Sequence, residues 1–209
     1  ISEMGVIQIG RKKPLLVCTN CTARSRKDQL QRLYSSHIDP YTGEIRKVLS
    51  LVPVKIQYKY DGETYEKTPD NNDFQILNRI SSEPVLEGVP IKKIPYLHMT
   101  HERANMENHG ITMIHHFHNQ RQLNTLGTIW SKVQSKEQPM RNWLAFFFEQ
   151  GIHTISLLNR YRENQSSQSN QVMNGVFYIP SIIAETSPWY RFSNKSRGKM
   201  KTFSNTLEK

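Results

Sequence analysis

The chain has 209 residues, with 28 Lys and Arg against 18 Asp and Glu, a formal net charge of +10 and a pI near 9.6. With 36% hydrophobic and 10% aromatic residues it can bury a core, which excludes a wholly disordered protein. No apolar run approaches the ~18–20 residues that span a bilayer, and no secretory signal is visible. Two cysteines exclude a disulfide-stabilised miniprotein and suit a reducing compartment, so we expect a cytoplasmic location.

Charge is unevenly distributed along the chain. The net charge is +7 over residues 1–60, −4 over 61–110, +2 over 111–186 and +5 over 187–209. Clustered Lys and Arg bind polyanions such as DNA because they release condensed counterions. The two basic ends therefore favour a nucleic-acid partner, although solvated surface charge would give the same counts.

The first part of the chain has the pattern of short strands joined by turns. Apolar runs at 5–10 and 14–18 are bounded by Gly, Pro and charged residues, as strands are. A capping sequence and two leucines on one helical face predict a short helix over 25–34. Residues 39–43, Asp-Pro-Tyr-Thr-Gly, have the composition of a turn.

A hairpin and a helix follow. Apolar and polar residues alternate over 52–60, and Asp61-Gly62 is a tight-turn sequence, which together predict a hairpin over 52–67. Asp70 is a suitable cap for a helix over 71–80. Residues 81–110 show no period and contain three prolines, which predicts an extended, Pro-rich strap.

The second half of the chain is predicted to be mainly helical. Apolar positions at helical spacing predict helices over about 119–135, capped by Asn119, and about 139–161. The second helix is apolar nearly all round its first half, so we expect burial on several sides. A strand is predicted over 175–183 after a polar loop.

These elements predict an α+β fold with a β-rich N-terminal part. Composition divides the chain into a basic, CxxC-containing subdomain over 1–50, an α+β core over 51–186 and a basic tail over 187–209.

Cys18-Thr-Asn-Cys21 has the spacing of a zinc knuckle. Two thiolates separated by two residues bind zinc from one tight turn, but zinc needs four ligands and this chain has no second pair. A redox CxxC normally begins a helix in a βαβ unit, which the sequence does not predict. Two interpretations stay open, a zinc half-site at Cys18 and Cys21 and a pair of free thiols.

Six histidines lie between His98 and His118, and His115 and His116 are adjacent. Adjacent side chains point in different directions, and neither an HExxH motif nor paired carboxylates accompany them. We therefore expect roles in a polar core and at the start of a helix rather than a metal site. No nucleophile, phosphate loop or carboxylate cluster completes a catalytic site, so we expect no catalytic or cofactor-binding residue in this chain.

Five strings of residues carry a resemblance to one family. They are Val52–Asp70, Ile91–Arg103, Gly110–Phe117, Leu158–Tyr161 and Gly175–Ser181. In this order they resemble the central segment of bacterial DNA methyltransferases of the amino type, which methylate adenine N6 or cytosine N4 with S-adenosylmethionine. In that family the cofactor loop lies upstream of such a segment and an Asp-Pro-Pro-Phe tetrad lies downstream.

The resemblance implies that this chain is an internal recognition segment, inactive alone, whose partners are double-stranded DNA and the rest of the parent enzyme. Cys18 and Cys21 match the second knuckle of a zinc ribbon, although Thr22 stands where the family usually has Gly. Asp39-Pro40-Tyr41 resembles the Asp-Pro-Pro-Tyr tetrad, but it lacks the second Pro and is expected to be an ordinary turn.

A methyltransferase that flips a base must hold the distorted duplex through phosphate contacts. The residues expected to make them are the basic side chains near the cysteines and in the tail. They are Arg11, Lys12, Lys13, Arg24, Arg26, Lys27, Arg191, Lys195, Arg197, Lys199 and Lys201. Two alternatives stay open, a freestanding nucleic-acid-binding module and a scaffold segment that never contacts DNA.

Overall fold

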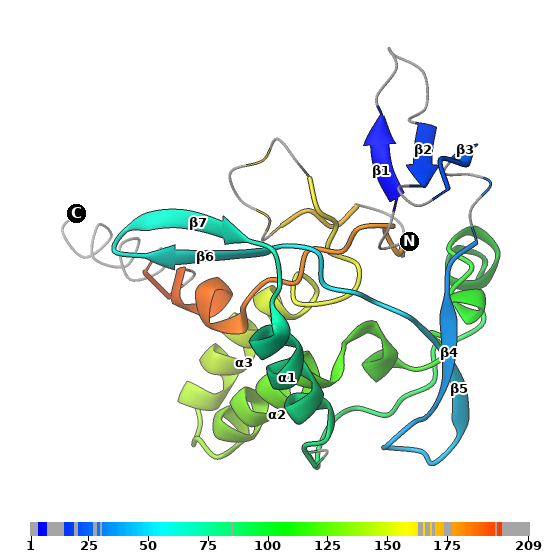
Figure 1. Ribbon diagram of the computed structural model, residues 1–209. Coiled ribbons are helices and arrows are strands. Elements are labelled where there is room, and N and C mark those ends of the chain that lie inside the picture. Colours follow the sequence, from blue (N-terminus) through cyan, green and yellow to red (C-terminus); the bar gives the residue numbers. More distant parts are fainter. Residues whose placement is uncertain are drawn as a thin grey trace. The chain divides into compact units, whose positions relative to one another are not determined.

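The computed structural model describes residues 4–7, 15–18, 21–26, 29, 31–84, 86–162, 165, 168, 170–173, 177–194, 196 and 197. The chain forms two compact units (Figure 1). Unit 1 comprises Ile1–His37 and Ile45–Asn78, and unit 2 comprises Ile38–Glu44 and Arg79–Lys209. The protein is a mixed α+β structure with small antiparallel sheets. No described helix is long and apolar enough to cross a membrane.

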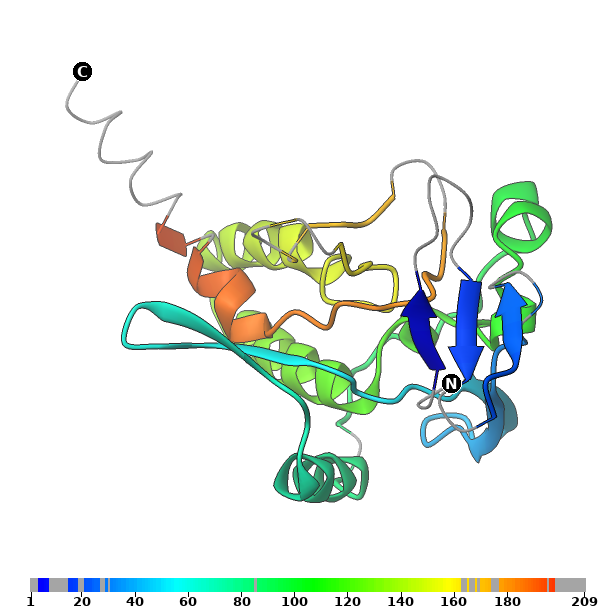
Figure 2. The same ribbon diagram turned by 45° about the horizontal axis from the view of Figure 1, so that its top comes forward.

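Unit 1 contains three small antiparallel sheets, each built from strands that are neighbours in sequence. Its strands are β1 (Met4–Ile7), β2 (Leu15–Cys18), β3 (Arg24–Arg26), β4 (Tyr34–Ile38), β5 (Ile45–Leu49), β6 (Ile56–Tyr60) and β7 (Glu63–Lys67). They pair in the orders β1-β2-β3, β4-β5 and β6-β7, and Figure 2 shows the three-stranded sheet from a second direction. Helix α1 (Asn71–Ser81) follows the last hairpin.

The hairpin predicted over 52–67 is confirmed, with shorter strands. Its turn residues Asp61 and Gly62 have φ angles of 48° and 81°, which Asp tolerates and Gly adopts freely. The helix predicted over 71–80 is also confirmed. Asp70 Oδ1 accepts hydrogen bonds from the N–H groups of Asn72 and Asp73, and Asp73 Oδ2 accepts one from the Asp70 N–H.

The short helix predicted over 25–34 is wrong at both of its ends, while residues 27, 28 and 30 within it lie outside the described residues. Ser25 lies in β3, where it is paired with Leu16, and Tyr34 begins β4. Cross-strand pairing has therefore overridden the local capping pattern. The strands that flank the turn at 39–43 were not predicted, because Tyr34–Ile38 contains two serines and a histidine rather than a β-branched run.

Unit 2 is built around a pair of helices, α2 (Gln120–Gln134) and α3 (Met140–Ile152). The predicted cap of α2 is confirmed: Asn119 Oδ1 accepts from the Gln122 N–H, and Gln122 Oε1 accepts from the Asn119 N–H, each at 3.0 Å. Shorter turns precede the pair, namely η2 (His98–Arg103), η3 (Glu107–His109) and η4 (Ile114–Phe117). The first two lie in the segment that was expected to be extended.

Helix α3 ends nine residues before the predicted end at 161. The Thr154 and Ser156 hydroxyls donate to the carbonyls of Gly151 and His153, at 2.9 and 2.5 Å. Such local hydrogen bonds compete with helix continuation. The strand predicted over 175–183 is wrong for its described residues: 177–183 form no strand and make a single β-bridge, between Ile183 and Arg160.

The core of unit 2 lies where α3 packs against α2. Leu126, Phe148 and Ile155 are buried, and Ile129, Trp130, Ile152 and Phe192 pack around them. The expected burial of α3 on several sides is wrong, because Trp143 and Phe146 are 64% and 55% exposed. Phe192, from the helical residues 188–194, stacks on Phe148 and lies against Gly151.

The contact between Phe192 and Gly151 gives a test of this packing. A Cβ at position 151 would lie 2.6 Å from Phe192 Cε1, so we expect Gly151→Ala to lower the free energy of unfolding by about 1 kcal/mol, overpacking outweighing the helix-propensity gain. Urea unfolding measures the change. The matched control is Gly127→Ala in α2, whose nearest neighbour is Leu86 at 3.4 Å and which should be neutral or stabilising. Equal effects of the two changes would contradict the packing.

Candidate functional site

The turn between β4 and β5 places one carboxylate in the interior of unit 2. The Asp39 N–H donates to the Glu44 carbonyl, and the Gly43 N–H donates to the Asp39 carbonyl, both at 2.8 Å. Gly43 has a φ of 73°, which favours glycine. The Tyr41 N–H also donates to Asp39 Oδ1, at 2.9 Å. These bonds define the direction of the Asp39 side chain, which is 2% exposed.

Two adjacent histidines reach the same point from η4. Their side chains are 2% and 3% exposed, for His115 and His116 respectively. The short helix is held in place from its N-terminal side, because the Ile114 N–H donates to the Lys92 carbonyl and Met113 forms a β-bridge with Lys93. Both imidazoles are therefore positioned by backbone contacts and not only by their own hydrogen bonds.

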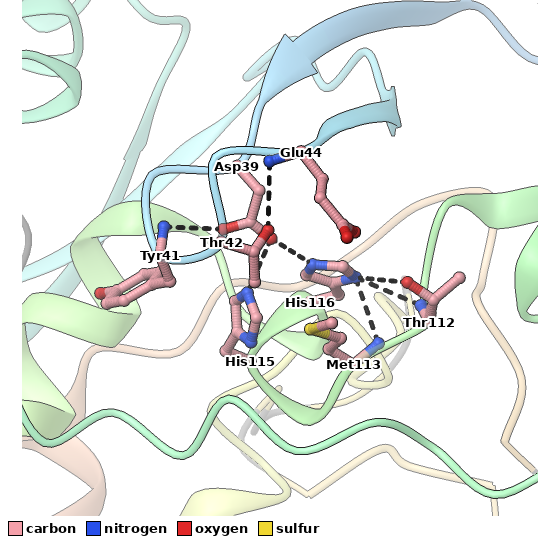
Figure 3. A network of polar contacts seen from close by, with 8 residues as sticks. All are labelled: Asp39, Tyr41, Thr42, Glu44, Thr112, Met113, His115 and His116. Carbon is pink, nitrogen blue, oxygen red and sulfur yellow. Dashed lines mark hydrogen bonds and ion pairs between the residues drawn. The ribbon is translucent and has the colours of Figure 1, made fainter.

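A single oxygen of Asp39 bonds to both imidazoles. Oδ2 lies 2.8 Å from His115 Nε2 and 2.6 Å from His116 Nε2, as Figure 3 shows. The two rings are edge-on to each other at a centroid distance of 4.3 Å, and Tyr41 lies edge-on to His115 at 5.1 Å. The result is a buried cluster of one carboxylate, two imidazoles and one phenol ring.

The protonation of His116 follows from its neighbours. Its Nδ1 lies 3.2 Å from the backbone N–H groups of Thr112 and Met113, which can only donate. Nδ1 must therefore carry a lone pair, and in the neutral ring the proton sits on Nε2. From there it is donated to Asp39. His115 also faces Asp39 with Nε2, while its Nδ1 has no hydrogen-bond partner among the described residues.

The carboxylate of Asp39 is held ionised. Burial alone would raise its pKa, but the hydrogen bonds from His116, the Tyr41 N–H and His115 more than offset this, so the pKa lies well below its usual value. Burial, together with the negative charge of Asp39, raises the pKa of the Tyr41 phenol. The cluster thus consists of an anion and the groups that donate to it.

His118, two residues further on, contacts a different part of unit 2. Its Nδ1 lies 2.7 Å from the Ile155 carbonyl, which accepts only, so Nδ1 carries the proton. Burial lowers the pKa of His118 from 6.5 to about 4, although this hydrogen bond acts in the opposite direction. His118 is therefore neutral at pH 7.

Asp39, His115 and His116 offer ligand atoms that lie within 4.8 Å of one another, the only such group of three or more in the described part of the chain. The groups that surround the two imidazoles do not fit a metal. A ligating imidazole usually donates its other N–H to an acceptor, but Nδ1 of His116 faces two donors and Nδ1 of His115 faces no acceptor in the described chain. Binding through His116 Nε2 would require an imidazolate. The geometry fits a hydrogen-bonded network better than a metal centre.

The residues predicted to bind zinc are separate from this cluster. Cys18 is half-buried and Cys21 is exposed. The Cys18 N–H donates to the Ala23 carbonyl and the Thr22 N–H donates to the Cys18 carbonyl, which forms a tight turn with Thr22 at φ 58°. No third ligand lies near them among the residues that the structure describes.

Four of the predicted DNA-contacting residues are described. Arg24 and Arg26 are exposed on β3, and Arg197 is exposed near the C-terminal end of the described chain. Arg191 is half-buried, and burial lowers the pKa of its guanidinium. The other predicted residues, Arg11, Lys12, Lys13, Lys27, Lys195, Lys199 and Lys201, lie outside the described residues.

The polar-core role expected for the histidine pair agrees with its burial, but the partner of the pair was missed. Asp39 was expected to be only a turn residue, and it is separated from His115 by 76 positions. An aspartate in a turn is usually exposed, so its position gives no sequence signal of burial. Comparison of the chain with protein-family models, curated proteins and solved structures found no match.

Removing the charge of Asp39 tests whether unit 2 depends on it. We expect Asp39→Asn to lower the free energy of unfolding by about 3 kcal/mol, because the amide NH₂ of Asn cannot accept the hydrogen bonds that the carboxylate accepts. Tryptophan fluorescence in urea is the readout, since all three tryptophans lie in unit 2. Asp61→Asn, in an exposed turn, should change stability by less than about 0.5 kcal/mol. Similar losses in both variants would refute the dependence.

His118 gives a prediction for pH. Its pKa is about 4 in the folded protein and near 6.5 in the unfolded chain, so between these values the unfolded chain binds more protons. The contribution of His118 is therefore complete above pH 6.5 and falls by up to about 3 kcal/mol as the pH drops to 4. His118→Asn, which keeps an N–H donor but does not titrate, should flatten the dependence of unfolding free energy on pH. His37→Asn, at an exposed position, should leave it unchanged.

Proposed function

We propose that this chain is an internal, DNA-contacting segment of an amino-type DNA methyltransferase, a cytoplasmic enzyme that uses S-adenosylmethionine. The family resemblance of five strings in one order supports the enzyme class. The observation that carries the DNA contact is the pair of exposed arginines on β3, Arg24 and Arg26. In this proposal the cofactor site and the catalytic tetrad belong to other parts of the parent enzyme.

Strand β3 is suited to phosphate binding by its position and its alternation. It is the outer strand of the β1-β2-β3 sheet and pairs with β2, Arg24 opposite Val17 and Arg26 opposite Leu15. Residues two apart lie on the same face of a strand, about 6.6 Å apart, and here both are exposed while Ser25 between them is half-buried. Two guanidinium groups so spaced can contact neighbouring phosphates of one DNA strand.

The cysteine turn fits the same proposal. Cys18 ends β2, and Cys21 lies three residues before Arg24. Zinc bound by this turn, with two further ligands from the parent enzyme, would rigidify the connection that presents the arginines. The likeness to a degenerate zinc ribbon is thus part of the proposal.

The Asp39–His115–His116 network has a structural role in this proposal. Its three side chains are only 2–3% exposed. A base flipped out of DNA would need an open pocket, which groups so deeply buried do not line. The network instead holds the turn and η4 in fixed positions within unit 2.

The salt dependence of DNA binding tests the proposal. We expect the double change Arg24→Glu and Arg26→Glu to weaken binding of a duplex at least about tenfold at 0.1 M salt. It should also reduce the slope of log K against log salt by about 2, one unit for each lost phosphate contact. Fluorescence anisotropy with a labelled duplex over a salt series gives both quantities.

The matched control is Lys132→Glu with Lys136→Glu, which changes net charge equally at exposed positions in or just after α2. A control that weakens binding as much as the β3 change would contradict the proposed surface. If neither change affects binding in the parent enzyme, the result contradicts the β3 contact and supports the scaffold alternative. Tight binding by the 209-residue chain alone, with the full salt dependence, would favour the freestanding module.

A further inference from the structure

The buried Asp39–His115–His116 network can take up a proton at three places. The three differ in which existing hydrogen bonds the added proton would disrupt. The three are the carboxylate of Asp39, Nδ1 of His116 and Nδ1 of His115. With a neutral histidine pair the network carries one negative charge. Each place can be compared through the hydrogen bonds that the structure assigns to it.

Protonation of His116 disrupts the backbone that positions it. A proton on Nδ1 would point at the N–H groups of Thr112 and Met113, each 3.2 Å away. The Thr112 hydroxyl, at 3.4 Å, is too distant to replace them with a strong hydrogen bond. His116 can therefore become charged only if the 112–113 backbone moves away.

Protonation of Asp39 is also costly. Three donors point at its carboxylate, the Tyr41 N–H on Oδ1 and the two imidazoles on Oδ2. Neutralising the acceptor weakens all three bonds, because a hydrogen bond to a charged group is stronger than one to a neutral group. The same bonds are the reason for the lowered pKa of this carboxylate.

A proton on His115 breaks nothing. Its Nδ1 is buried and has no partner among the described residues, so a proton there breaks no existing hydrogen bond, and its cost is one buried N–H that lacks an acceptor. The resulting imidazolium keeps its Nε2 contact with Asp39 at 2.8 Å and forms an ion pair with it. The net charge of the network then changes from −1 to zero, which favours a buried site.

By this comparison His115 takes up a proton before His116 and Asp39. The other titratable groups near His115 do not change this order of protonation. Tyr41, edge-on to the ring, is neutral at pH 7 because burial raises its pKa. Glu44, on the same turn, has an exposed side chain. His118 would repel a charge on His115, but its own pKa of about 4 keeps it neutral through mild acid.

We propose that the Asp39–His115–His116 network is a proton-operated latch on the turn 38–44, in which His115 takes the first proton without structural change. The turn is released from the rest of unit 2 only when a second proton reaches His116 or Asp39. The first proton keeps the latch closed, and the second opens it. The device is independent of the proposed DNA contact.

The test follows the order of protonation by NMR in the uniformly ¹⁵N-labelled 209-residue chain. Long-range ¹H–¹⁵N spectra distinguish the two neutral tautomers from the imidazolium, and the Gly43 amide, which donates to the Asp39 carbonyl, reports on the turn. As the pH falls from 8 to 4, we expect His115 to be an imidazolium while His116 still carries its proton on Nε2 and the Gly43 signal is unchanged. His116 should gain its second proton only when the Gly43 signal shifts.

Two results would overturn the latch. One is a charged His116 in a molecule whose Gly43 signal is unchanged, and the other is a turn that opens while His115 is still neutral. A variant adds an independent readout: His115→Gln keeps an N–H donor for Asp39 but cannot hold the first proton. We expect it to move the opening of the turn to higher pH by about one unit, because the positive charge that opposed the next proton is gone. An unchanged midpoint would refute the coupling, and His37→Asn serves as the control.

Discussion

One carboxylate oxygen, buried in unit 2, accepts hydrogen bonds from two imidazoles, and much of that unit depends on it. Burying an ionised carboxylate is costly unless donors satisfy it, and Asp39 receives such donors from two distant segments of the chain. The constraint acts in both directions. It orients the turn at 38–44, and it orients the rings of His115 and His116 on η4.

The effect extends through η4 into the rest of the unit. The four consecutive residues 115–118 divide their contacts between two segments. His115 and His116 bind Asp39, while the Phe117 carbonyl accepts from the Leu157 N–H at 2.8 Å and His118 donates to the Ile155 carbonyl. Since Asn119 then caps α2, one short turn connects the carboxylate, the segment after α3 and the start of α2. Breaking the hydrogen bonds of the network would therefore disturb three places in unit 2.

Features that depend on neighbouring residues could be predicted from the sequence, whereas those that depend on distant contacts could not. The β6-β7 hairpin follows from the Asp61-Gly62 turn, and the starts of α1 and α2 follow from their caps. The helix expected over 25–34 failed because Ser25 pairs with a strand nine residues earlier. The candidate site was not predicted for the same reason, since Asp39 acquires its role only through its contacts with His115 and His116. A local pattern contains no information on a contact across 76 residues.

The two units differ in what holds them together, and this bears on the proposed DNA contact. Wherever burial is described, each buried hydrophobic residue belongs to unit 2, and none of the unit 1 residues 17, 18, 21–26, 29, 31–37 and 45–78 is buried. In this part of unit 1 the described contacts are ladder hydrogen bonds, turns and caps, and small hairpins of this kind are marginally stable in water. A ligand that binds only the ordered form would stabilise it in proportion to its concentration. Contact of Arg24 and Arg26 with a duplex would thus stabilise β3 as well as position the DNA, which couples recognition to the folding of the unit that performs it.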